Sequence, residues 1–408
     1  MTVLLTNLPP ELIIRILEDL PSRDIGRLSR TCSQLRSICR TDIVWQKLCQ
    51  QICDIAVEEW NTTYYNIFTK VLHRYGRCLG LWRRNMRPYG GLMQVKVCIR
   101  LKSSCLCMIL YIQVDNGRLL ATEYKPPYVS DIHGPLRPKK VFSIGINKFK
   151  NRTEILCLHG YGEAHPGSIE FETEESDVEF KCCQMSSHAH PKGSSVELST
   201  MIKKETNNHT IPFTIDDQKR LECYMKNVPK YRLTRIEVQR PDPVYPIQPG
   251  LFLAHYRAHG IEMFLLKYDM NKKETEVIKI TGDPNVPAGE TSIYINLRKP
   301  MQLTKDQQLD VNSLLLLEEE DIPDSDDVQP RNQPFVIPPG FSTFLDDFTP
   351  STCEYRYFAR GRIAGDDYRD PNLISVHVVP FEAHGVFFVL WFKFWDMDGF
   401  YKITDINI

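Results

Sequence analysis

Hydrophobic residues in the first part of the chain recur at the three- and four-residue spacing of amphipathic helices. The run after Pro9 and Pro10 places its apolar side chains on one face and stops at Pro21, which cannot continue the hydrogen-bond ladder. Two further helical runs follow, one over residues 25–38 and one that begins at Asp42. Three short helices bury little apolar surface alone, so we expect a partner or a following domain to cover part of it.

A further helix is predicted over residues 62–81, and the pattern then changes to that of strands. From residue 93 onward, apolar residues alternate with polar ones or cluster in short runs that turn sequences separate. Many short strands with turn breaks are typical of an antiparallel barrel. The predicted fold class is α+β, with an N-terminal helical module and a β-rich antiparallel barrel-like domain with a few helices. The strand-like runs are residues 93–99, 107–114, 141–146, 154–158, 235–238, 260–268, 292–297, 374–379 and 386–395.

These patterns divide the chain into residues 1–50 as the helical module, 51–87 as a helical linker packed on it, and 88–408 as the β-rich domain. Residues 318–334 are strongly acidic and almost without apolar side chains, so they cannot offset their ordering entropy by burial. We predict a disordered loop there. A solvated loop without a role is the favoured interpretation, and a docking or regulatory segment with Ser325 as a phosphorylation site is the alternative.

Composition narrows the classes of partner. The 408 residues carry 50 basic and 51 acidic side chains, so no global basic field favours nucleic acid or an anionic membrane. The N-terminus lacks a secretory signal, and the longest late apolar run is far shorter than the roughly 20 residues of a membrane helix. The 13 cysteines then indicate reduced thiols. We expect a protein of the cytoplasm, and also of the nucleus, without nucleic-acid or membrane partners.

The helical module carries a motif. Three features of this module together resemble an F-box. They are the start Leu8-Pro9-Pro10-Glu11-Leu12, the break at Pro21 and the ending Asp42-Ile43-Val44-Trp45. The resemblance implies binding to a Skp adaptor and, through it, to a cullin scaffold and a RING protein. A helical hairpin of an unrelated α domain is the alternative. Trp45 is expected to pack the helices together. The residues expected to face the adaptor are Leu8, Pro9, Leu12, Ile16, Leu20, Leu28 and Cys32.

Further strings resemble the F-box only protein 31 family in the family's order. They include Leu79-Gly80-Leu81-Trp82, Pro88-Tyr89-Gly90-Gly91-Leu92, Pro249-Gly250-Leu251-Phe252 and Thr281-Gly282-Asp283-Pro284-Asn285-Val286-Pro287-Ala288-Gly289. The last string is long and unusual enough to be specific. The resemblance implies a β-rich domain that receives the extended C-terminal end of a target, including D-type cyclins and proteins that end in a C-terminal amide.

A Cys/His set has the spacing C-x7-H-x16-C-x5-H, formed by Cys157, His165, Cys182 and His188. Two thiolates and two imidazoles make a closed tetrahedral zinc site. Spacing alone favours unconnected buried cysteines and surface histidines, because the intervals are not those of the common zinc fingers. The family resemblance implies zinc ligands at these four positions, so a structural zinc is expected.

Candidate pocket residues follow from the chemistry of an amide end. An amide offers N–H donors and no charge, so a carboxylate accepts from it while repelling an ordinary C-terminal carboxylate. Asp283, in the turn of the long family string, is the candidate for this role. The alternative, which the sequence alone favours, is that Asp283 caps its own turn. The residues expected to wall the pocket are Tyr256, His259 and Trp391, with Phe252 and Trp395, although aromatics at strand spacing are more often core.

No catalytic set is apparent. The sequence has no G-x-S-x-G, no Walker loop, no H-E-x-x-H and no G-x-G-x-x-G after a strand. We therefore predict a non-catalytic substrate-recognition subunit of a Skp-cullin-F-box ubiquitin ligase, which acts by proximity. The alternatives are a scaffold that uses its β domain outside a ligase and, less favoured, a zinc enzyme.

Overall fold

The computed structural model describes most of the chain, in thirteen stretches. It divides into two compact units. The first contains Met1–Gly80, Gln94–Thr122 and Lys140–His190, and the second contains Leu81–Met93, Glu123–Lys139 and Pro191–Ile408. The strand predicted at residues 107–114 lies outside the described residues, which are 5–55, 57–98, 117–127, 131–147, 149–158, 164–171, 177–183, 230–243, 245–256, 259–269, 271–325, 331–343 and 350–406.

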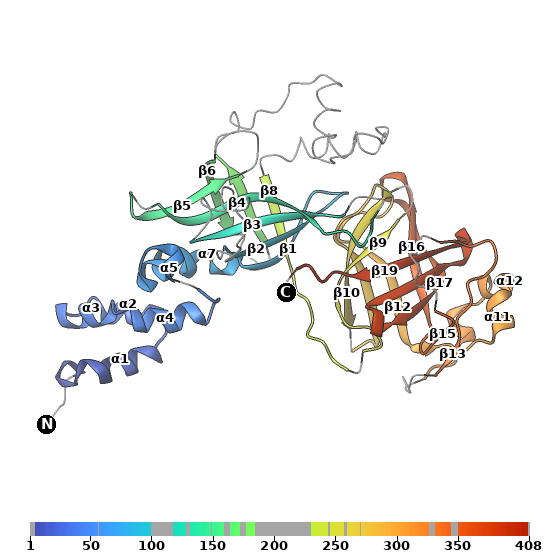
Figure 1. Ribbon diagram of the computed structural model, residues 1–408, viewed down its shortest axis with the longest axis horizontal. Coiled ribbons are helices and arrows are strands. Elements are labelled where there is room, and N and C mark those ends of the chain that lie inside the picture. The colour runs from blue at the N-terminus through green and yellow to red at the C-terminus, as the bar shows by residue number, and fades with distance from the viewer. Residues whose placement is uncertain are drawn as a thin grey trace, which may run out of the picture. The chain divides into compact units, whose positions relative to one another are not determined.

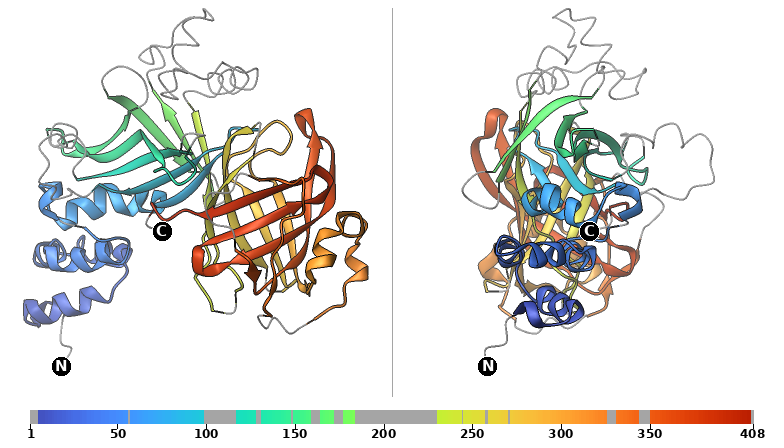
Figure 2. Two further views of the ribbon diagram at one scale, coloured as in Figure 1. Left: turned by 45° about the vertical axis from the view of Figure 1, so that its right-hand side comes forward. Right: turned by 90° about the vertical axis from the view of Figure 1, so that its left-hand side faces the viewer.

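Short helices open the first unit and pack around a small apolar core (Figures 1 and 2). Helix α1 (Pro10–Glu18) starts directly after Pro9, where proline costs no backbone hydrogen bond, and buries Ile13 and Leu17. Trp45 is buried and its indole Nε1 donates to Cys39 O at 2.6 Å, so it packs the helices together as predicted. The remaining helices are α2 (Ser22–Leu28), α3 (Ser33–Cys39), α4 (Asp42–Gln50), α5 (Val57–Trp60), α6 (Tyr64–Ile67) and α7 (His73–Tyr75), with a π-helical turn at Phe68–Leu72 and 3-10 turns at Leu5–Asn7 and Gly76–Cys78.

The first group of strands forms a closed barrel in sequence order, in which β8 returns to pair antiparallel with β1. Strand β1 (Gly80–Arg84) lies inside the region predicted as a helical linker, so that prediction is wrong for its last part. The helical segment ends before Gly80, whose φ of 117° leaves the helical region, and Leu81, Trp82 and Arg84 are buried. The other strands are β2 (Leu92–Val97), β3 (Arg118–Lys125), β4 (Arg137–Asn147), β5 (Arg152–Cys157), β6 (His165–Phe171), β7 (Asp177–Cys182) and β8 (Lys230–Ile236).

A second sheet, of nine strands, lies in the second unit, and its strand β19 also pairs with β9, which closes it on itself. The fold-class prediction of N-terminal helices followed by a β-rich, antiparallel barrel-like domain is confirmed, although the strands form two closed sheets where one domain was predicted. Helices α11 (Lys305–Leu309) and α12 (Val311–Leu315) lie on the outside of this barrel (Figure 1). The strands are β9 (Gly250–His255), β10 (Ile261–Asp269), β11 (Glu274–Lys279), β12 (Thr291–Pro300), β14 (Ser342–Thr343), β16 (Tyr357–Gly365), β17 (Arg369–Phe381), β18 (Val386–Trp391) and β19 (Asp396–Lys402), with β13 (Gln333–Pro334) and β15 (Thr352–Cys353) as a separate pair.

Alternate side chains of these strands fill the interior of the second barrel. Phe252, Phe264, Val277, Phe387 and Phe400 belong to this core and are fully buried. Aromatic edges and faces meet there, as in the T-shaped contact of Phe252 with Phe387 at 5.2 Å between ring centroids. Because the core fills the middle of the barrel, a pocket inside this barrel is expected toward one of its ends.

The acidic segment differs from the prediction. Residues 318–325 are ordered: Glu319–Asp321 forms a 3-10 turn, and Ile322 is buried next to Met301 and Phe358. Basic side chains of neighbouring strands pair with it, as in Lys299 Nζ with Asp324 Oδ1 at 3.3 Å. Burial of Ile322 and these ion pairs therefore keep residues 318–325 ordered. The prediction of disorder is therefore wrong for residues 318–325, and residues 326–330 lie outside the described part.

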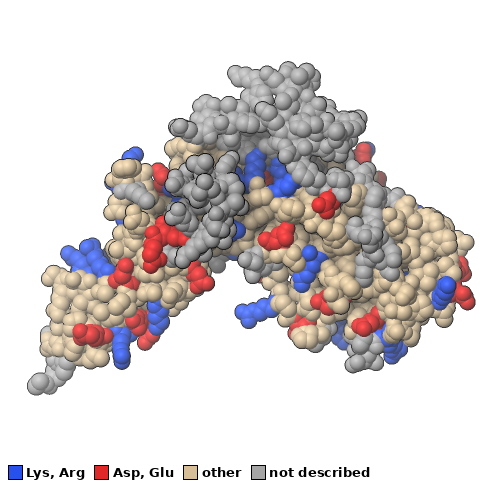
Figure 3. Space-filling model, in the orientation of Figure 1, with Lys and Arg blue, Asp and Glu red and all other residues tan. Residues whose placement is uncertain are grey.

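Charges of both signs are interspersed among the described residues on the face shown in Figure 3. This agrees with the near-zero net charge of −1. Within the described residues, no helix has the length and apolar character needed to cross a lipid bilayer.

Candidate functional site

The long family string at residues 280–289 forms a loop that interlocks with residues 88–91. Gly91 N donates to Ile280 O at 3.2 Å, Gly282 N donates to Tyr89 O at 3.1 Å, and Ala288 N donates to Pro88 O at 2.7 Å. Only glycine fits at two of these positions. A Cβ on Gly90 would meet Ile280 O at 2.3 Å, and one on Gly282 would meet Ala288 N at 2.2 Å. Two strings that are far apart in the sequence thus fix one loop.

This loop presents Asp283 beside Lys279, at the end of β11. Both side chains are almost fully buried, and the Lys279 ammonium pairs with the Asp283 carboxylate and with Glu262 Oε2, at 2.6 Å for the latter. Burial alone would lower the pKa of Lys279, but the two carboxylates more than offset it and raise that pKa. Burial likewise would raise the pKa of Asp283, and the Lys279 charge lowers it below its usual value. Lys279 and Asp283 are therefore both ionised at neutral pH.

The Asp283 carboxylate is engaged by its own loop. Its Oδ1 accepts from Asn285 N at 2.7 Å and from Val286 N at 2.9 Å, while Oδ2 accepts from Lys279. This is the turn-capping arrangement that the sequence favoured. A carboxylate has about four lone-pair sites, so these three bonds leave about one for a further donor.

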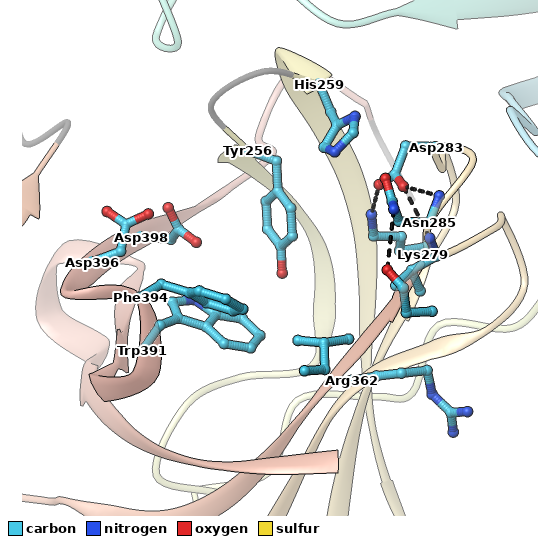
Figure 4. A pocket seen from close by; sticks show the side chains of 13 residues that line it. Tyr256, His259, Lys279, Asp283, Asn285, Arg362, Trp391, Phe394, Asp396 and Asp398 are labelled. Carbon is cyan, nitrogen blue, oxygen red and sulfur yellow. Dashed lines mark hydrogen bonds and ion pairs between the residues drawn. The ribbon is translucent and has the colours of Figure 1, made fainter. Parts of the chain in front are cut away.

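A cavity of about 390 Å³ opens beside this loop, at one end of the second barrel (Figure 4). Tyr256, Trp391 and Phe394 contribute its aromatic walls. The ring centroids of Tyr256 and Trp391 are 6.4 Å apart in a T-shaped arrangement. Figure 4 shows Lys279, Asp283 and Asn285 on one side of Tyr256 and the carboxylates of Asp396 and Asp398 on the other. The volume lies within the range of roughly 300–1,000 Å³ that is usual for ligand pockets.

Four of the predicted pocket residues line this cavity, namely Tyr256, His259, Asp283 and Trp391. Two aromatic residues proposed for its walls do not. Phe252 lies in the barrel core, where it is fully buried, and Trp395 is a positive-φ residue whose side chain is 46% exposed and contacts Phe341. The residues that the sequence pattern did not indicate are Lys279, Asn285, Arg362, Phe394, Asp396 and Asp398.

The alternation of Asp396, Asp398 and Phe400 along β19 was the available signal for two of them. Every second residue of a strand faces the same side, and Phe400 points into the core, so Asp396 and Asp398 face inward as well. Both are only 6% exposed. Burial raises the pKa of the Tyr256 phenol well above its usual value, and the negative charge of Asp398 raises it further.

The residues predicted to face an adaptor are all partly or fully exposed. In α1, Leu12 and Ile16 are 46% and 42% exposed, while Ile13 and Leu17 on the adjacent face are buried. Exposed Ile43 adds to the uncovered apolar surface of the helices. The other predicted adaptor residues, none of which is buried, are Leu8, Pro9, Leu20, Leu28 and Cys32.

Three of the predicted zinc ligands, Cys157, His165 and Cys182, are residues at the ends of strands β5, β6 and β7. Cys157 and His165 are directly opposite each other in the β5–β6 pairing, and both are buried. The backbone of Cys182 pairs with that of Gly167, two residues beyond His165 on β6. The side chain of Cys182 and the whole of His188 lie outside the described residues. In the part that is described, no group of three or more candidate ligands comes together, so the zinc site stays a prediction.

Comparison with known proteins first identifies the domains of the chain and, from them, the class of protein. Residues 5–51 match the F-box-like family, and residues 233–401, which include the whole cavity, match the Cyclin D1 binding domain family. The chain is thus an F-box protein, the substrate receptor of a Skp-cullin-F-box ubiquitin ligase.

Its relatives narrow the class further. The chain is 27% identical to F-box only protein 31 of Mus musculus over 423 residues, which cover 90% of this chain and 78% of that protein. It is 27% identical to F-box only protein 31 of Homo sapiens, with 90% and 77% covered, and 26% identical to F-box only protein 31-A of Xenopus laevis, with 90% and 78% covered. Over 90% of its length, the chain is therefore similar to F-box only protein 31.

Proposed function

We propose that the cavity of the second barrel captures the C-terminal ends of target proteins, D-type cyclin-like proteins among them, for ubiquitination and proteasomal degradation. One observation carries this: the cavity of about 390 Å³ at the barrel end lies wholly within the residues that match the Cyclin D1 binding domain family. A chain end enters such a pocket more easily than a continuous chain does, because only one strand of peptide has to enter.

The charges of the cavity favour an uncharged end. Asp283, Asp396 and Asp398 face two lining cations, Lys279 and Arg362, and Glu262 adds a fourth carboxylate against Lys279. Among these described side chains, the carboxylates outnumber the lysine and arginine cations. A C-terminal carboxylate would be repelled, whereas an amide donates N–H groups, so we propose that C-terminally amidated proteins are preferred. Asp283 retains about one lone-pair site for such a donor.

The chain's own contribution is proximity rather than chemistry. An adaptor bound to the exposed apolar residues of α1 would connect the receptor to a cullin scaffold and its RING protein, which supply the transfer reaction. Burial of each such side chain contributes about 1.5–3 kcal/mol. We place this activity in the cytoplasm and the nucleus, and we propose that zinc at Cys157, His165, Cys182 and His188 is structural, since four protein ligands leave no open position for a substrate.

The test uses one decapeptide from the C-terminus of a D-type cyclin, made with an amide end and with an acid end. Affinities of both forms are measured for the wild-type chain and for Asp283→Asn. We expect the wild type to bind the amide form at least tenfold more tightly, and Asp283→Asn to narrow this difference because one repelling charge is gone. Equal affinity in all four combinations would contradict the amide preference, and absence of binding to either form would contradict capture of chain ends.

A further inference from the structure

A side-chain amide lies next to Asp283 in the same turn. Asn285 lines the cavity on the same side of Tyr256 as Lys279 and Asp283, and its backbone N–H donates to Asp283 Oδ1 at 2.7 Å (Figure 4). Asn285 is thus two residues from the carboxylate to which the amide end of a target is assigned. A carboxamide differs from a carboxylate because it carries no charge and has donors as well as an acceptor.

The orientation of this carboxamide follows from its hydrogen bonds. Asn285 Nδ2 donates to Ala364 O at 3.0 Å and to Asp366 Oδ1 at 3.4 Å. A carbonyl and a carboxylate accept hydrogen bonds, so the nitrogen faces them and the oxygen Oδ1 is directed away from them. Among the described residues, no donor bonds to this oxygen. Asn285 is partly exposed and lines the cavity, so Oδ1 is an acceptor that solvent or a ligand reaches.

The turn that carries Asn285 is fixed on both sides. Tyr368 N donates to Pro284 O at 2.9 Å, so the segment after β16 is bonded to the backbone next to Asn285 as well as to its side chain. On the other side, Asp283 Oδ1 accepts from Val286 N at 2.9 Å. A group that its own fold already holds in place loses little freedom when a ligand binds, so a hydrogen bond to it contributes more to affinity.

We propose that Asn285 Oδ1 is a second acceptor for the amide end, so that Asp283 and Asn285 together recognise a primary amide. A primary amide has two N–H donors. Asp283 retains about one lone-pair site for the first donor, and Asn285 Oδ1 accepts from the second. A secondary amide, in which a carbon group replaces one of the two hydrogens, leaves one acceptor without a donor. The inference rests on the proposed capture of amide ends and adds the chemical form of the end that is selected.

The experiment compares four ends on the same decapeptide, namely a primary amide, an N-methyl amide, a methyl ester and a free acid. The primary amide has two N–H donors, the N-methyl amide has one, the ester has none, and the acid adds a negative charge. Calorimetric titration measures the affinities for the full-length wild-type chain, for Asn285→Ala and for Asn312→Ala. Asn312 is the matched control, because it is exposed on α12 and does not line the cavity. Melting temperatures of the three proteins are measured in parallel.

We expect the wild type and Asn312→Ala to bind the primary amide about tenfold more tightly than the N-methyl amide, as the loss of one buried hydrogen bond implies. Asn285→Ala should bind the primary amide about tenfold more weakly than the wild type does, and it should lose no affinity for the N-methyl amide. The preference for the primary amide then depends on the residue at position 285.

Three outcomes would overturn this role of Asn285. Equal affinity of the wild type for the primary and N-methyl amides would show that the second N–H is not used. Unchanged affinity of Asn285→Ala for the primary amide would show that the wild-type preference is steric. An equal loss for all four ends would show that Asn285 acts only through the shape of its loop. Equal binding of the primary amide and the acid by the wild type, or binding of neither, would overturn the proposed amide preference as well.

Discussion

Gly361 of β16 lies directly against the indole ring of Trp391. A Cβ at position 361 would approach the ring carbon Cζ3 to 2.2 Å, a distance that real side chains do not adopt. The absence of a side chain at position 361 therefore allows Trp391 to stand where it forms a wall of the cavity.

Gly361→Ala should displace this wall. The added methyl group overpacks the contact, at a cost of about 1–3 kcal/mol of unfolding free energy, and it moves the indole into the cavity. Peptide affinity should fall at least tenfold. Gly365→Ala on the same strand is the control, because its Cβ would meet only ordinary contacts at 3.6 Å and beyond. Titration of both variants with one amide-ended peptide checks this, and equal affinities would contradict the assigned wall.

Removing different buried charges near Asp283 should lower the unfolding free energy by different amounts. Lys279→Met leaves two buried carboxylates facing each other, so it should lower the unfolding free energy by about 3–5 kcal/mol. Asp283→Asn should cost less, since Glu262 still pairs with Lys279. Lys267→Met is the matched control, because its pair with Glu276 is partly exposed to solvent and is worth less than about 1 kcal/mol. Denaturant unfolding measures all three, and a reversed order would exclude Lys279 as the compensating charge.

A buried histidine should make the second barrel sensitive to acid. His377 is fully buried and accepts from Arg356 Nη1 at 3.2 Å through its Nδ1, since arginine only donates. Burial, and then the Arg356 charge, lower the pKa of His377 well below 6.5. Below pH 6.5 the unfolded state therefore binds a proton that the folded state does not, and stability falls as the pH falls, by about 1.4 kcal/mol per pH unit.

Unfolding at pH 7.0 and at pH 5.5 measures this contribution. His377→Gln keeps an acceptor for Arg356 and should lose less stability between the two values than the wild type. His384→Gln, which replaces an exposed histidine, should behave as the wild type does. An identical pH dependence for all three proteins would show that His377 is protonated in the folded state.

Metal content tests the zinc prediction. The purified chain should hold about one equivalent of zinc, and Cys157→Ser should lose it, because a closed site needs all four ligands. Cys183→Ser is the control, since Cys183 is an exposed neighbour outside the predicted set. Elemental analysis gives the readout. A zinc content well below one equivalent in the wild-type protein would contradict the predicted zinc site.

Much of the architecture could be predicted because its signals are local. The helical spacing after Pro9, the stop at Pro21 and the alternation in later segments depend on residues close in sequence. Residues 318–325 were predicted wrongly because their order depends on Ile322 and on basic side chains from distant strands. The first barrel strand was predicted as helix because apolar spacing alone did not mark the helix end, although Gly76 and Gly80 are stop signals.

The candidate site was predicted only in part, because some of its residues come together through contacts between segments that are far apart in sequence. Tyr256, His259, Asp283 and Trp391 line the cavity as expected. Burial of Lys279 and of the two β19 aspartates depends on the closure of the sheet by the pairing of β19 with β9, which a local pattern does not encode. Polar residues in a strand are usually interpreted as solvent-facing, so the alternation of Asp396 and Asp398 with Phe400 indicates burial only once the closure of the sheet is known.

The most direct test of the account is affinity capture of the full chain and of a Leu12→Asp/Ile16→Asp variant from the same cells. Both side chains are exposed on α1, so the variant should fold normally, and Leu315→Asp/Leu316→Asp on exposed positions of the second unit is the control. We predict that the α1 variant loses the Skp adaptor and the cullin, while it still binds amide-ended peptides as the wild type does. Unchanged adaptor and cullin in the α1 variant would contradict the assignment of this surface and, with it, the account of how the receptor joins its ligase.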